Sequence, residues 1–145
     1  MPPPKDSGTN DPREAVTERS KLTARHLAAS LPGELHRARR VRVFDEQGPV
    51  EPARKRRGRA PSALLADLTD TDALSTLATA LQVRPDTDVM HWMSWPDLWL
   101  AFSDDQGDLL LILGLIRPDW VRWDPHGDLR LAAPESLGDW LTDWA

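Results

Sequence analysis

The sequence predicts an α+β protein, in which a small antiparallel β-meander of three to five strands carries two short amphipathic helices on one face. Two observations predict this fold. Apolar residues alternate with other residues in several short segments between 97 and 131, and turn residues separate these segments. Apolar residues spaced three or four apart, as on one face of a helix, occur at 74–81 and 137–144.

The two parts of the chain differ in charge and in aromatic content. Residues 1–61 contain fourteen Lys and Arg against eight Asp and Glu, whereas residues 62–145 contain four against fifteen. All seven tryptophans lie between Trp92 and Trp144. We therefore expect a basic, largely flexible N-terminal arm at 1–61 and a compact, acidic, Trp-rich domain at 62–145.

Within the arm, the pattern predicts one helix and one strand. Residues 1–12 are rich in proline and polar residues, so they bury too little to offset the entropy of ordering. The spacing of alanine and leucine predicts a helix at 13–31, which Pro32 and the glycine after it should end. Residues 40–44 alternate like a strand, and 48–61 have the composition of a charged linker.

Two helices are expected in the compact domain. Thr69 should cap the first, with Asp72 at the capping-box position, and Pro85, after the apolar stripe, should end it. Pro134 suits the first position of the second helix, because proline there lacks only a donor that would be unsatisfied anyway. Its apolar stripe consists of Leu137, Trp140, Leu141 and Trp144.

The predicted strands lie between these helices. Residues 97–103 place Leu98, Leu100 and Phe102 on one face, and the turn that follows contains Gly107 where a positive φ is needed. The next segment is apolar on both faces, as in a central strand. The remaining expected elements are strands at 109–116, 120–123 and 129–131, with a type I turn at 124–127.

The stretch of about residues 89–144 resembles a small uncharacterised domain of high-GC bacteria. The resemblance lies in the order MHWMSWPDLWLAFSDDQGDLLLILGLIRPDWVRWD, followed by an acidic turn and a closing helix. In that pattern a polar-aromatic strand leads to an aliphatic strand, a glycine-containing bend and an Arg-Trp pair. The resemblance implies an α+β fold and no known activity.

The tryptophans have two interpretations. A small domain gains much apolar burial from each indole, so most of them should lie in the core. Trp140 and Trp144 share the helical stripe, and the strand parity of Trp120 and Trp123 requires at most one of them to face inward. The core explanation is weakest around Pro96. There we expect a protein-binding surface made of Trp92, Trp95, Asp97 and Trp99.

The basic run RKRRGRAP is similar to the minor-groove AT-hook, whose core is Arg-Gly-Arg-Pro. Arg57, Gly58 and Arg59 match that core, but Ala60 separates Arg59 from Pro61 and changes the register. Arginines of such a motif lie in a narrow A·T groove, where the potential is most negative. The alternative is a solvated linker. The nucleic-acid hypothesis rests on Arg54, Lys55, Arg56, Arg57 and Arg59.

No catalytic or metal-binding pattern stands out. The chain has no cysteine, so it has no disulfide, thiol nucleophile or Cys-based metal site. His91 and His126 lack metal-ligand spacing, and the sequence contains no nucleotide-binding glycine loop and no nucleophile elbow. We therefore expect no metal, no cofactor and no enzyme activity.

The sequence also bears on location and partners. The first twenty residues lack the apolar region of a signal peptide, and the longest apolar run is too short for a membrane helix. We expect a cytoplasmic bacterial protein that does not bind membranes. The leading hypothesis is a non-enzymatic protein-interaction or regulatory module with an unknown protein partner. The alternative is an accessory nucleic-acid-binding protein that acts through residues 54–59.

Overall fold

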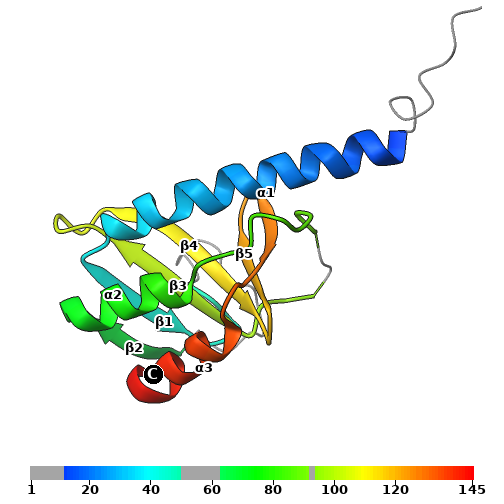
Figure 1. The fold of residues 1–145 in the computed structure, drawn as a ribbon. Coiled ribbons are helices and arrows are strands. Elements are labelled where there is room, and N and C mark those ends of the chain that lie inside the picture. Colours follow the sequence, from blue (N-terminus) through cyan, green and yellow to red (C-terminus); the bar gives the residue numbers. More distant parts are fainter. Residues whose placement is uncertain (1–11, 50–62, 92–93) are drawn as a thin grey trace, which may run out of the picture.

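The computed structural model describes residues 12–49, 63–91 and 94–145, which form three helices and six strands (Figure 1). In chain order the elements are α1 (Pro12–His36), β1 (Arg40–Phe44), β2 (Leu64–Leu68), α2 (Thr71–Ala80), β3 (Leu98–Ser103), β4 (Leu109–Ile116), β5 (Trp120–Trp123), β6 (Gly127–Arg130) and α3 (Pro134–Trp144).

The strands form one antiparallel sheet in the order β2-β1-β3-β4-β5-β6, and the three helices pack on one face of it (Figure 1). The predicted α+β class is confirmed. The predicted size is too small, because the described residues form a sheet of six strands rather than three to five, covered by three helices rather than two. β3 to β6 form a simple meander, and β1 separates β2 from it.

The hydrophobic core contains residues from both parts of the chain. Leu27, Leu31 and Leu35 of α1 are buried, and Val41 and Val43 of β1 are fully buried between β2 and β3. The compact unit therefore begins within α1 and not at residue 62. The sequence-based division at 61 missed this because charged residues surround these few apolar positions and dominate the composition of the segment.

α1 does not end at Pro32 as predicted. The helix continues through the proline to His36. A proline inside a helix loses one backbone hydrogen bond and crowds the preceding turn, at a cost of about 3 kcal/mol. Leu31 and Leu35 lie on opposite sides of this point in the chain but on the same helical face, and both are buried. The burial of these two leucines in the core stabilises the helix and offsets the cost of Pro32.

The other two helices begin close to the predicted residues. The N-cap of α2 is Asp70 rather than Thr69, because the Asp70 carboxylate accepts a hydrogen bond of 2.9 Å from the backbone N–H of Ala73. Either residue type can cap a helix, so the sequence pattern left the position uncertain by one residue. α3 begins at Pro134, as predicted.

The strands predicted at 97–103, 109–116 and 120–123 are confirmed, whereas the last strand is Gly127–Arg130 rather than 129–131, and one turn differs. Gly107 has a φ of 82° in the turn between β3 and β4, as expected. The predicted type I turn at 124–127 is wrong. The backbone N–H of His126 donates to the carbonyl of Trp123 at 2.7 Å, so the turn closes over residues 123–126 and starts one residue earlier than expected.

The segment between α2 and β3 pairs with residues at the β6 edge of the sheet. Beyond β6, the backbone of Val83 bridges to Leu131, and Met90 exchanges two backbone hydrogen bonds with Asp128. The chain then returns to β3, and Pro96 packs closely over Gly114 of β4, where an added Cβ would lie 2.7 Å from the proline Cγ. We call the sheet face opposite the helices the outer face. This return brings Trp95 beside Trp99, on the outer face.

Candidate functional site

Trp95 and Trp99 form an aromatic pair on the outer face. Their ring centroids lie 5.7 Å apart, with the planes at 65°, which is the favourable edge-to-face arrangement. The indole N–H groups of both residues point to the backbone carbonyl of Glu46, in the loop after β1, and Trp99 lies 3.4 Å from it. These contacts join the start of β3 to the β1–β2 loop. We call Trp95, Trp99, Glu46, Asp97 and Arg117 the tryptophan corner.

Exposure differs within this pair. Trp99 is half-buried, and it lies against Gly48, whose φ is 74° and whose Cβ position is 3.0 Å from the Trp99 indole nitrogen. Trp95 is 58% exposed. An indole that is mostly in solvent yet held by a hydrogen bond and a neighbouring ring loses little conformational freedom when a partner covers it.

Asp97 lies beside the two rings and carries a partner of its own. Its carboxylate accepts from the backbone N–H of Arg117 at 3.1 Å, and the Arg117 guanidinium lies 3.4 Å away. Both side chains are exposed, so this ion pair contributes little to stability. It supplies charged groups of both signs at the rim of the exposed indole.

The structure therefore brings together three of the four residues of the predicted binding surface, Trp95, Asp97 and Trp99. The fourth, Trp92, lies outside the described residues. No sequence pattern indicated Glu46 and Arg117, because one acts through its backbone carbonyl and the other comes from the loop after β4. The basic run from Arg54 to Arg59 also lies outside the described part of the chain.

The remaining tryptophans are divided between core and surface. Trp140 is buried, and its indole N–H donates to the carbonyl of Ala73 at 2.9 Å. Trp123 faces the helices and Trp120 the outer face, so only one of this pair points inward, as expected. Trp144 is 38% exposed, so its predicted core position is wrong. It lies in the last turn of α3, where the helix extends past the residues that could cover it.

The four arginines of residues 62–145 all pair with aspartates. The pairs are Arg84–Asp86, Arg117–Asp97, Arg122–Asp128 and Arg130–Asp119. Arg40 of β1 makes a further pair with Asp67 of β2, and its hydrogen bonds hold the pKa of that carboxyl below the usual range. In each of these pairs an aspartate close by compensates the charge of the arginine.

The pair of Arg122 and Asp128 is the most enclosed of these. The two residues are neighbours across β5 and β6, with a separation of 2.8 Å between Nε and the nearer carboxylate oxygen. Asp128 is completely buried and Arg122 is 16% exposed. The hydrogen bond from the guanidinium to Asp128 raises the pKa of Arg122. This pair fixes the junction between the meander and the segment around Met90.

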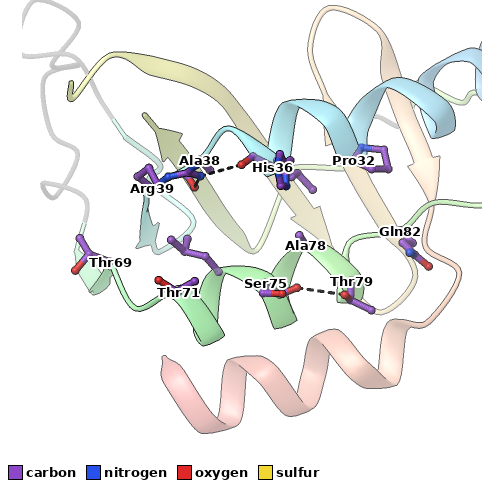
Figure 2. A pocket seen from close by; sticks show the side chains of 12 residues that line it. Pro32, His36, Ala38, Arg39, Thr69, Thr71, Ser75, Ala78, Thr79 and Gln82 are labelled. Carbon is purple, nitrogen blue, oxygen red and sulfur yellow. Dashed lines mark hydrogen bonds between the residues drawn. The ribbon is translucent and has the colours of Figure 1, made fainter. Parts of the chain in front are cut away.

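A second candidate site, which is concave, lies on the helix side of the sheet and was not expected from the sequence. It is a groove of about 510 Å³ between the C-terminal end of α1 and one face of α2, shown in Figure 2. We call it the α1–α2 groove. Its lining comes from segments that are distant in sequence, so no local sequence motif predicts it. Leu35, Ala38, Leu74 and Ala78 provide aliphatic surface, and the polar lining includes His36, Arg39, Thr71, Ser75, Thr79 and Gln82.

The described residues show no arrangement that would hold a metal ion, since no three His, Asp or Glu side chains among them converge. His126 instead packs against the ring of Trp123, with centroids 4.8 Å apart. In the same part of the chain, no helix is long and apolar enough to cross a membrane.

Comparison of the chain with protein-family models, curated proteins and solved structures gives no match.

Proposed function

We propose that this protein is a protein-interaction module, and that the tryptophan corner is its contact surface. The observation that carries the proposal is Trp95, a large indole that is 58% exposed although it is held by Trp99 and the Glu46 carbonyl. Tryptophan is among the residue types most enriched in the side chains that dominate binding energy at protein interfaces.

The surroundings of Trp95 support the same proposal. Interfaces place an aromatic anchor at the centre and polar groups at the rim. Asp97 and Arg117 provide a negative and a positive group beside the ring, and the half-buried Trp99 extends the aromatic surface. Trp95 lies on a segment tied to the sheet at Asp97, whose N–H donates to the Leu115 carbonyl at 2.8 Å. The anchor is therefore presented by the sheet.

A matched pair of tryptophan variants tests the proposal. Replacing the anchor, Trp95→Ala, should weaken binding of a protein partner by about 2 kcal/mol or more, roughly thirtyfold. Trp144→Ala removes another exposed indole from the far end of α3 and should leave binding unchanged. Partners are identified by cross-linking and affinity purification from cells that make the protein, and affinity is then measured with the purified partner by calorimetry. A partner that binds Trp95→Ala as tightly as the wild type would contradict the proposal.

The alternative function, nucleic-acid binding through Arg54 to Arg59, has one supporting observation. The segment lies between β1 and β2 in the chain, and Phe44 and Leu64 on its two sides pair across these strands, so five basic residues fall within one connection at the sheet. Replacing all five with glutamine in the full chain should strongly weaken binding to A·T-rich duplex DNA. The slope of log affinity against log salt should fall by about one for each phosphate that the variant no longer neutralises. Unchanged affinity in a gel-shift titration would exclude this function.

A variant that lacks residues 1–61 is unsuitable for this test, because α1 and β1 are part of the core.

A further inference from the structure

We propose that the α1–α2 groove is a binding site for a small amphipathic organic anion, with a carboxylate at the Arg39 end and an aliphatic body along α2. This site is separate from the tryptophan corner, because it lies on the helix side of the sheet and the corner lies on the outer face. Its volume of about 510 Å³ is within the range of small-molecule sites.

The floor of the groove fits an aliphatic chain. Leu35 of α1 and Leu74 and Ala78 of α2 belong to the surface of the hydrophobic core, and Leu74 and Ala78 are only partly buried. Covering such surface with a hydrocarbon body is favourable by about 25 cal/mol per Å². The apolar surface of Leu74 and Ala78 therefore runs along the direction of α2.

Hydroxyl groups line the α2 side of the groove. Thr71, Ser75 and Thr79 are four residues apart, so they lie in one row on the helix over a length of about 12 Å. Thr79 uses its hydroxyl proton to donate to the Ser75 carbonyl at 3.2 Å, as Figure 2 shows. The row ends toward Gln82, whose amide closes the groove at the opposite end from Arg39 (Figure 2).

The charge of the lining selects an anion. Two basic side chains, His36 and Arg39, line the groove, and no Asp or Glu of the described residues does. This is unusual in a chain with a net charge of −5. Among the described residues, Arg39 makes no ion pair, whereas the four arginines of residues 62–145 each face an aspartate. The structure thus keeps one guanidinium at the groove available for an external carboxylate.

The Arg39 guanidinium is held in place by backbone carbonyls at the end of α1. One Arg39 nitrogen, Nη1, donates to the carbonyls of His36 and Ala38 at 2.9 and 3.0 Å, which satisfies carbonyls at the negative end of α1. These bonds fix the guanidinium and leave Nε and Nη2 to meet a carboxylate. Thr71, the first residue of α2, lies at the same end of the groove and adds a hydroxyl group to its lining (Figure 2).

Octanoate and its neutral analogue octanamide test the proposal in a ¹H–¹⁵N chemical-shift titration of the full chain. We expect octanoate to bind more tightly than octanamide, with shifts confined to amides around Leu35 to Arg39 and Thr69 to Gln82. Arg39→Gln should weaken octanoate binding about tenfold and leave octanamide binding unchanged, since a charge-assisted hydrogen bond is lost. The matched control Arg37→Gln changes a neighbouring exposed arginine that does not line the groove and should have no effect.

A second variant covers the case in which Arg39→Gln destabilises the end of α1. Ala78→Phe fills the groove without touching Arg39 and should abolish binding of both probes. Equal affinities for octanoate and octanamide, or shifts that lie mainly outside the groove, would overturn the proposal. The proposal would also be wrong if neither probe bound and the groove instead bound an amphipathic helical peptide, because the occupant would then be a protein segment.

Discussion

Replacing Asp128 with alanine should lower the free energy of unfolding by about 3 kcal/mol or more, the largest effect expected of any single polar residue in the described part of this protein. The reason is that Asp128 is completely buried and Arg122 is 16% exposed, so the variant leaves a mostly enclosed guanidinium without its carboxylate. Urea denaturation followed by tryptophan fluorescence measures the change as a shift in the midpoint.

A double variant separates the loss of the ion pair from the cost of enclosing a guanidinium without Asp128. If the enclosed guanidinium causes the effect, Arg122→Met combined with Asp128→Leu should be more stable than Asp128→Ala alone, because both charges are then absent. A midpoint for Asp128→Ala within experimental error of the wild type would show that Arg122 finds solvent or another partner at no cost.

The second large effect is expected for Trp140→Ala, which should destabilise the protein by about 3–5 kcal/mol. Trp140 is 1% exposed, and with Leu137 it forms the buried part of α3. Its N–H also links α3 to α2 through the Ala73 carbonyl. The substitution therefore leaves a large cavity between two helices and removes the hydrogen bond that joins them.

Trp144→Ala is the matched control on the same helix, and because Trp144 is 38% exposed its effect should be within about 0.5 kcal/mol. Trp140→Phe isolates the hydrogen bond from most of the packing and should fall between the two. The measurement is again chemical denaturation, with far-ultraviolet circular dichroism to follow helix content. Similar losses for Trp140→Ala and Trp144→Ala would mean that α3 is docked differently.

Sequence patterns predicted the meander well because its strands are regular. Leu98, Leu100 and Phe102 alternate over a strand with one face against the helices, and β4 is apolar on both faces because it is central. β2 was missed. It has only five residues, LLADL, and its two leading leucines are exposed at the sheet edge, so the sequence does not alternate between buried and exposed positions.

α1 and β1 show a different limit of sequence reasoning. Net charge over residues 1–61 describes what faces solvent, whereas the core depends on a few positions such as Leu31 and Val41. The tryptophan corner was predicted in part, since a proline between indoles signalled an interrupted strand. The α1–α2 groove could not be predicted from the sequence, because Arg39 and Thr71 become neighbours only when β1 and β2 pair.

The position of β1 between β2 and β3 has a consequence for synthesis on the ribosome. Val41 pairs with Leu68 on one side and with Phe102 on the other, and the second partner is made only after β2, α2 and the following loop. A nascent chain that has completed its first hairpin therefore presents a free, mainly apolar strand edge. Long-range pairing of this kind slows folding and exposes the chain to association with other chains. The growing chain is thus most vulnerable to aggregation in the interval before β3 emerges.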